Sequence, residues 1–189
     1  MTPEDPFQVL VAVMLSARTK DPTTNEVMRR LWPRAHTPQA LLKLPEAKLA
    51  EALNPVGFYR TKAKQLQGLC RMLVEEFDGK VPDTLAELER LPGVGRKTAN
   101  LVLSICFEIP AICVDTHVHR IANRLGWVKT KTPPETEEAL MALFAKKHWG
   151  VINRVLVNHG QRVCNPIGPR CSECVIARQC PRTGVVKPR

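Results

Sequence analysis

Leu91-Pro-Gly-Val-Gly-Arg-Lys-Thr-Ala99 is the most informative segment of the chain. Gly93 and Gly95 allow a tight turn and a close approach by another chain. Gly95 also stands where a helix predicted from about Arg96 to Phe107 exposes its first amide groups. Amides at the positive end of a helix dipole can hold a phosphate without reading a sequence. The alternative interpretation is a plain turn between two helices.

Two cations in the first turn of this helix favour the phosphate interpretation, because they oppose the helix dipole and need another reason to be there. Lys97 is also a candidate nucleophile. An amine attacks only when it is neutral, and both the helix N-terminus and the adjacent Arg96 disfavour its charged form. A lysine that simply pairs with phosphate explains the same residue equally well.

Asp115 follows eighteen positions later. The intervening helix is about 18 Å long, and the connection after it can span about 23 Å, so the chain can return to Lys97. A carboxylate there could take or steer protons. The alternative is that Asp115 only caps the helix that it begins. His117 and His119 point to different sides of that helix, which disfavours a metal site with Asp115.

Four cysteines near the end have the spacing Cys164-x6-Cys171-x2-Cys174-x5-Cys180. In a chain with no sign of an export signal, four thiolates this close indicate tetrahedral zinc or a cubane iron-sulfur cluster rather than disulfides. Spacing does not choose between the two metals. Either would fold a loop too poor in apolar residues to fold by itself. Ordinary buried positions are predicted for the remaining cysteines, Cys70, Cys106 and Cys113.

The rest of the chain is predicted to be all-α. Helix caps and helical periods recur along it, and no alternating pattern lasts long enough to build a sheet. About ten helices are expected, the clearest over residues 7–17, 21–32, 59–77, 96–107 and 149–163. Leu53-Asn-Pro-Val-Gly57 followed by a basic helix echoes the segment at 91–95. Two helix-turn-helix units of similar design are therefore expected.

Composition points to an intracellular protein with an anionic partner. The 189 residues are 44% hydrophobic and 24% charged, enough for a core without disulfides. No apolar run reaches the roughly 18 residues of a membrane span. Of the net charge of +10, residues 146–189 supply +8, which favours nucleic acid. Aromatic residues, at 5%, are too few for single-strand stacking platforms, so duplex backbone contacts fit better.

Three motifs in this order resemble endonuclease III, the helix-hairpin-helix DNA glycosylase family with a 4Fe-4S cluster: Leu91 to Ala99, Val114-Asp-Thr-His-Val-His-Arg120 and the four cysteines. The resemblance extends from about Pro6 to Pro181. It implies a two-lobed all-α fold, with residues 1–19 and 127–189 in the cluster-containing lobe. The helical lobe would be residues 20–126, with the hairpin at about 91–107. The cysteine loop would be 164–180, and Cys164, Cys171, Cys174 and Cys180 would ligate the cluster.

The resemblance also implies a bifunctional DNA glycosylase and abasic-site lyase of base excision repair that acts on oxidised pyrimidines in double-stranded DNA. Lys97 would attack C1′ of a flipped nucleotide to give a Schiff base, with help from Asp115, and β-elimination would nick the strand. DNA contacts are implied for the hairpin residues Leu91, Gly93, Val94, Gly95, Arg96 and Thr98.

Phe58 and Arg18 match by position the family's gap-filling residues, where Leu and Gln respectively are usual. An arginine can donate to an orphaned base but cannot accept, which puts the opposite-base preference in doubt. The alternatives are a core Phe58 and a plain surface Arg18.

A non-catalytic helix-hairpin-helix module that binds DNA and carries a structural metal is the alternative function. A bacterial cytoplasmic location at the nucleoid, no membrane contact and a monomeric state complete the expectations.

Overall fold

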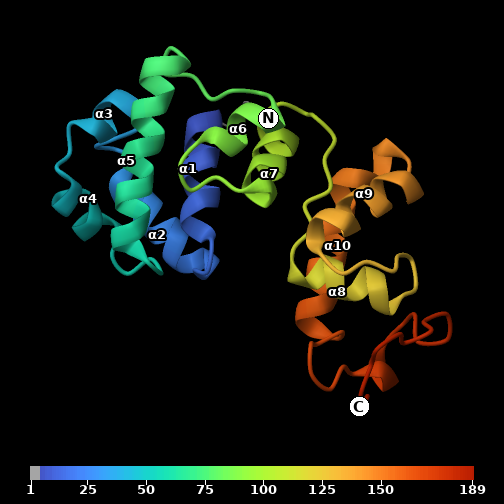
Figure 1. The fold of residues 1–189 in the computed structure, drawn as a ribbon. Coiled ribbons are helices and arrows are strands. Elements are labelled where there is room, and N and C mark those ends of the chain that lie inside the picture. The colour runs from blue at the N-terminus through green and yellow to red at the C-terminus, as the bar shows by residue number, and fades with distance from the viewer. Residues whose placement is uncertain (1–4) are drawn as a thin grey trace. The chain divides into compact units, whose positions relative to one another are not determined.

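The computed structural model describes residues 5–189 as helices joined by loops, and these residues contain no β-strand. The predicted all-α class is confirmed (Figure 1). The chain divides into two compact units, one that ends at Ile109 and one from Pro110 to Arg189. No helix of the described part is long and apolar enough to cross a bilayer.

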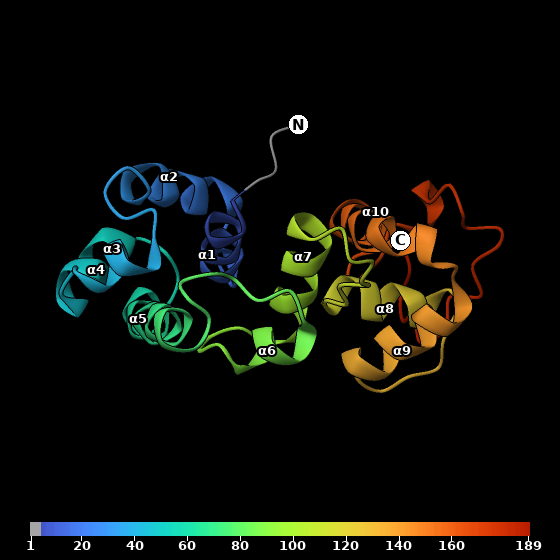
Figure 2. The same ribbon diagram turned by 90° about the horizontal axis from the view of Figure 1, so that it is seen from above.

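The first unit is built from helices that differ greatly in length. They are α1 (Pro6–Ser16), α2 (Asp21–Leu31), α3 (Pro38–Leu42), α4 (Glu46–Leu53), α5 (Tyr59–Glu76), α6 (Leu85–Arg90) and α7 (Arg96–Cys106). Helix α1 packs against α2, α5 and α7, and Figure 2 shows it with α2 on one side and α7 on the other.

Helix α1 is apolar nearly all round, and the structure buries it accordingly. Asp5 caps it by accepting a hydrogen bond from the Phe7 amide at 3.0 Å, and Pro6 is its first residue. Leu10 and Val11 have no exposed surface. The sequence predicts residues 1–19 in the cluster-containing lobe, whereas α1 packs in the core of the first unit. Residues 1–4 of that segment lie outside the described part of the chain.

The two predicted helix-turn-helix units are present as α4–α5 and α6–α7. Their turns share a leucine, a valine and a glycine at corresponding positions. Leu53 and Leu91 are both buried, as are Val56 and Val94. The valine amide donates to the leucine carbonyl in each turn, at 2.9 Å in the first and 3.0 Å in the second. The same local design therefore anchors both turns to one core.

The second unit contains α8 (Thr116–Arg124), α9 (Pro133–Leu143) and α10 (Trp149–Arg162), with short 3-10 turns η1 (Lys146–His148) and η2 (Cys171–Glu173). Helix α8 packs on α9 and α10, and its apolar side lies in their core. The division between the units therefore falls after Ile109, not after residue 126 as the sequence predicts. A helix belongs to the unit that buries its apolar face, and periodicity alone does not show which unit that is.

The segment after α10 has little regular structure and closes on itself through its last residues. The Arg189 amide donates to the Pro169 carbonyl at 2.8 Å, and the Ser172 amide donates to the Arg189 carbonyl at 3.0 Å. The Thr183 amide donates to the Arg124 carbonyl of α8 at 3.1 Å. These bonds fix the ends of the cysteine-containing loop.

Candidate functional site

The hairpin turn between α6 and α7 is fixed by its glycines and its two apolar residues. Gly93 has a φ of +81°, and a Cβ there would lie 2.7 Å from Met14 Cε and 3.1 Å from Gln65 Oε1. Only glycine fits such a place. Leu91 and Val94 are buried, so their side chains hold the turn and only their backbone groups can meet a ligand.

Gly95 is the N-cap of α7 and supplies no side-chain cap to its first amides. Nothing lies within 4 Å of the place where its Cβ would be. The uncapped end of α7 can thus receive an anion at its amide groups. Lys97 is exposed in this first turn, and Arg96 and Thr98 on either side of it are half-buried. The first unit therefore places an exposed lysine in the first turn of a helix that has no side-chain cap.

Asp115 opens the second unit as the N-cap of α8. Its Oδ1 accepts from the amides of His117 and Val118, both at 2.9 Å. The capping role that the sequence predicts is confirmed. Lys97 belongs to the first unit and Asp115 to the second.

The two histidines after Asp115 serve different structural partners. His119 Nδ1 lies 2.6 Å from Thr136 Oγ1 on α9. His117 Nδ1 lies 3.0 Å from Arg120 NH2 on its own helix. Their divergence agrees with the interpretation that they do not share a metal ion.

Arg18 and Phe58 are adjacent on the surface of the first unit. The Arg18 guanidinium carbon lies 5.6 Å from the centre of the Phe58 ring, a cation–π distance. Phe58 is 62% exposed, so the alternative of a core phenylalanine is wrong. Both residues have left-handed backbones, with φ of 56° at Arg18 and 58° at Phe58. Residues forty positions apart thus form one exposed pair.

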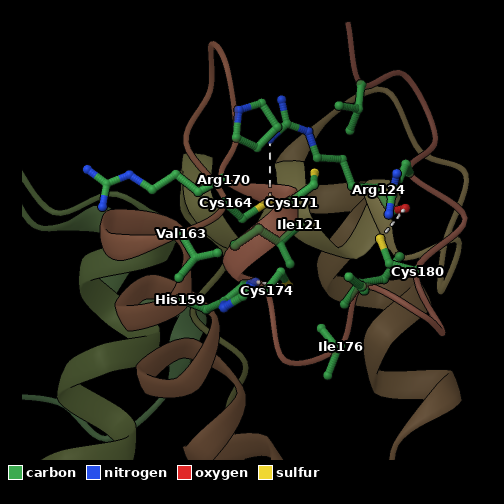
Figure 3. Close-up of a pocket in the computed structure, with 15 residues that line it drawn as sticks. Ile121, Arg124, His159, Val163, Cys164, Arg170, Cys171, Cys174, Ile176 and Cys180 are labelled. Carbon is green, nitrogen blue, oxygen red and sulfur yellow. Dashed lines mark hydrogen bonds between the residues drawn. The ribbon is translucent and has the colours of Figure 1, made fainter. Parts of the chain in front are cut away.

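The four cysteines with metal-ligand spacing line one pocket in the second unit (Figure 3). Each of them is half-buried, and none is in a disulfide. Cys164 Sγ accepts from Arg124 at 3.3 Å, and Cys174 Sγ lies 3.7 Å from His159 Nε2. Burial lowers the pKa of His159. Thiols that lie beside an arginine and a histidine suit a thiolate-bound group.

Among residues 5–189, no three His, Cys, Asp or Glu side chains converge closely enough to hold a single metal ion. A single zinc ion would draw four sulfurs to about 2.3 Å from one point. Four thiols that line one pocket are nevertheless the donor set by which an iron-sulfur cluster is held.

Two arginines of α8, a buried Arg124 and a half-buried Arg120, bond to the cysteine loop, and the sequence did not single them out as functional. Arg124 is 8% exposed and donates to the carbonyls of Asn165 and Pro166 at 2.6 and 2.8 Å. Arg120 donates to the Cys164 carbonyl at 2.8 Å, and burial lowers its pKa. The sequence did contain a signal for this role, because Arg120 and Arg124 are four residues apart and so lie on the same face of an amphipathic helix.

The remaining cysteines are structural. Cys70 and Cys113 are buried as predicted, and Cys106 is half-buried. Burial raises the pKa of the Cys70 thiol to about 12, so this thiol stays protonated at neutral pH.

The sequence matches the family model described as HhH-GPD superfamily base excision DNA repair protein over residues 11–146. It is 50% identical to endonuclease III of Thermotoga maritima, over 93% of this chain and 83% of that protein. The chain belongs to the endonuclease III family. A chloroplastic endonuclease III homolog of Arabidopsis thaliana, 43% identical over 93% of this chain, is longer, and the chain spans 48% of it.

Among solved structures of the endonuclease III family, a trapped endonuclease III–DNA covalent intermediate has a TM-score of 0.89 and 38% identity. The match covers 95% of this chain and 84% of that one. Membership confirms the predicted helix-hairpin-helix glycosylase fold and makes the chain a DNA glycosylase of base excision repair. It disfavours the alternative of a non-catalytic DNA-binding module.

Proposed function

We propose that the chain is a bifunctional DNA glycosylase and abasic-site lyase that removes oxidised pyrimidines from double-stranded DNA. The observation that carries the proposal is the exposed Lys97 in the first turn of α7, directly behind the uncapped Gly95. A phosphate held by the amides of that turn would bring the neighbouring sugar to the amine. The covalent endonuclease III–DNA intermediate of the structural relative supports the same chemistry.

In the proposed reaction the neutral Nζ of Lys97 attacks C1′ of an everted nucleotide. The bond from C1′ to the base breaks, and the base leaves with the electron pair and takes up a proton. The attached amine loses a proton, the C1′–O4′ bond opens, and a Schiff base forms. Removal of a C2′ proton then expels the 3′ phosphate by β-elimination. Asp115 would accept or deliver these protons.

Arg18 and Phe58 would fill the space that the everted nucleotide leaves. Eversion costs a few kcal/mol, less for a damaged base, and an inserted side chain offsets part of it. Phe58 supplies an apolar ring for the base stack, and Arg18 supplies donors for the orphaned partner base. Their exposure and their contact with one another support this role.

Cys164, Cys171, Cys174 and Cys180 would bind a 4Fe-4S cluster. Thiolate ligation would supply folding free energy to a loop that has few apolar residues of its own. The basic segment from residue 146 onward would then meet the DNA backbone. A monomer at the nucleoid of a bacterial cytoplasm completes the proposal, and the bacterial relative supports that location.

Borohydride trapping on a duplex with one abasic site tests the proposal. The wild-type protein should give a covalent complex, and Lys97→Gln should give none while it keeps most of its affinity for the duplex. Lys48→Gln, an exposed lysine of the same unit, is the matched control and should trap like the wild type. Trapping by Lys97→Gln, or no trapping by the wild type, would contradict the proposed nucleophile.

A further inference from the structure

Lys62 is a buried lysine that takes no part in the proposed reaction. Its side chain lies on α5 and is 6% exposed, so it cannot serve as a surface contact for phosphate. Its ammonium donates to the carbonyls of Leu15 and Ala17 at 2.8 and 2.6 Å, and to Thr19 Oγ1 at 3.3 Å. These acceptors are neutral oxygens in the turn that ends α1. Burial correspondingly lowers the pKa of Lys62.

The same residue reaches both turns that carry the exposed pair. On one side, its ammonium holds the Ala17 carbonyl, directly before Arg18. On the other side, its backbone amide donates to the Phe58 carbonyl at 3.0 Å. Thr19 Oγ1 closes the connection, because it also accepts from the Gly57 amide at 3.1 Å. The buried ammonium thus supports the Arg18 turn, and Thr19 Oγ1, which the ammonium also contacts, joins that turn to the Phe58 turn.

Close packing adds to this connection. A Cβ on Gly57 would lie 2.7 Å from the Arg18 carbonyl oxygen, so the two backbones touch. Left-handed backbones at Arg18 and Phe58 each cost free energy and persist only where the surroundings impose them. The buried ammonium imposes the first of these turns, since it satisfies carbonyls that the end of α1 leaves open.

We propose that Lys62 is a positioning residue for DNA engagement: it locks the Arg18 turn onto the Phe58 turn, so that guanidinium and ring enter the duplex as one preformed wedge. This inference rests on the proposed function, because it needs eversion of a nucleotide. A preformed wedge loses little conformational freedom when it inserts, which lowers the free energy of the everted complex. A methionine in this place would fill a similar volume but would leave the Leu15 and Ala17 carbonyls without the ammonium that holds the Arg18 turn.

Single-turnover excision by Lys62→Met from a duplex with one oxidised thymine tests the proposal. We expect the rate to fall on the order of tenfold to a hundredfold, as for other misplaced positioning groups. Trapping on a single-stranded abasic oligonucleotide, which has no stack to enter, should stay at the wild-type level. Lys64→Met, an exposed lysine on the same helix, is the matched control and should change neither measurement.

The wedge variant Arg18→Ala/Phe58→Ala separates positioning from folding. With the wedge already removed, Lys62→Met should cause no further loss of excision. An equal loss in both backgrounds, or a matching loss of single-strand trapping, would overturn the inference. If Lys62→Met does not fold, Thr19→Val removes the shared acceptor and should show the same dependence on the wedge. An inactive wild type would sink the proposed function, whereas an active wild type and an equally active Lys62→Met would sink this inference alone.

Discussion

The two units are stabilised in different ways. Among the described residues, the first has a core of 25 buried hydrophobic residues and the second has a core of eight. The second compensates with polar contacts, among them the bonds of Arg124 to the cysteine loop and a Thr130–Thr136 hydroxyl contact at 2.6 Å. A large apolar core keeps its stability when a polar residue on the surface is replaced. A polar network, or a loop held by metal ligands, loses stability when any one of its bonding residues is replaced. The comparison predicts that the two units respond differently to the same kind of damage.

The largest expected effect is the loss of a thiol from the proposed cluster site of the second unit. In Cys174→Ser, one ligand is weakened, and structural metal binding can contribute about 10 kcal/mol to folding. Amide hydrogen exchange should therefore lose protection over residues 164–189 and keep it over α5 and α7. Cys106→Ser is the control that removes a cysteine outside the loop. Unchanged protection over residues 164–189 in Cys174→Ser would show that the loop folds without its ligands.

A leucine truncation in each core compares the two units directly. Leu69 has no exposed surface, and Leu69→Ala should destabilise the first unit by about 3 to 5 kcal/mol, because a large core closes poorly around a cavity. Leu156→Ala in the second unit should cost about 2 kcal/mol, since its small core can relax. Amide hydrogen exchange of each unit, measured at increasing denaturant concentration, gives the two unfolding free energies. A larger loss for Leu156→Ala would invert the comparison.

The smallest expected effect concerns the capping box of α9. Thr132 Oγ1 accepts from the Glu135 amide at 3.4 Å, and Glu135 Oε2 accepts from the Lys131 amide at 3.0 Å. Thr132→Ala should destabilise the second unit by about 1 kcal/mol. The thermal midpoint at neutral pH measures it.

The pH dependence of the same box gives a second measurement. The backbone amide of Lys131 and the Thr132 hydroxyl lower the pKa of Glu135 from 4.5. The carboxylate therefore stabilises the folded unit fully when the pH is above the ordinary pKa of Glu135. This stabilisation is lost as the pH falls through the lower pKa that Glu135 has in the folded protein. Glu135→Gln should match the wild type in acid and be less stable at neutral pH. A difference that persists in acid would contradict the assignment.

The hairpin turn, the Asp115 cap and the cysteine-containing loop could be predicted because each is encoded by residues that are close together in the sequence. Gly93 needs a left-handed backbone, Asp115 caps the helix that follows it, and a metal loop shows in the spacing of its thiols. Periodicity likewise gave the helices to within a residue or two. The unit boundary could not be predicted in this way, because an apolar face shows that a helix is buried and does not show which core buries it.

The chain's own residue order thus determined an all-helical protein with a glycine hairpin, a lysine directly after it and a four-cysteine loop. Tertiary packing decided that Arg18 meets Phe58, that Lys62 is buried beneath both and that Arg124 supports the cysteine loop. Helix periods, caps and thiol spacing act within a few residues of the chain. The ammonium of Lys62 binds carbonyls of a turn more than forty residues away in the sequence. Such residues become neighbours only because α1 and α5 pack into the same core.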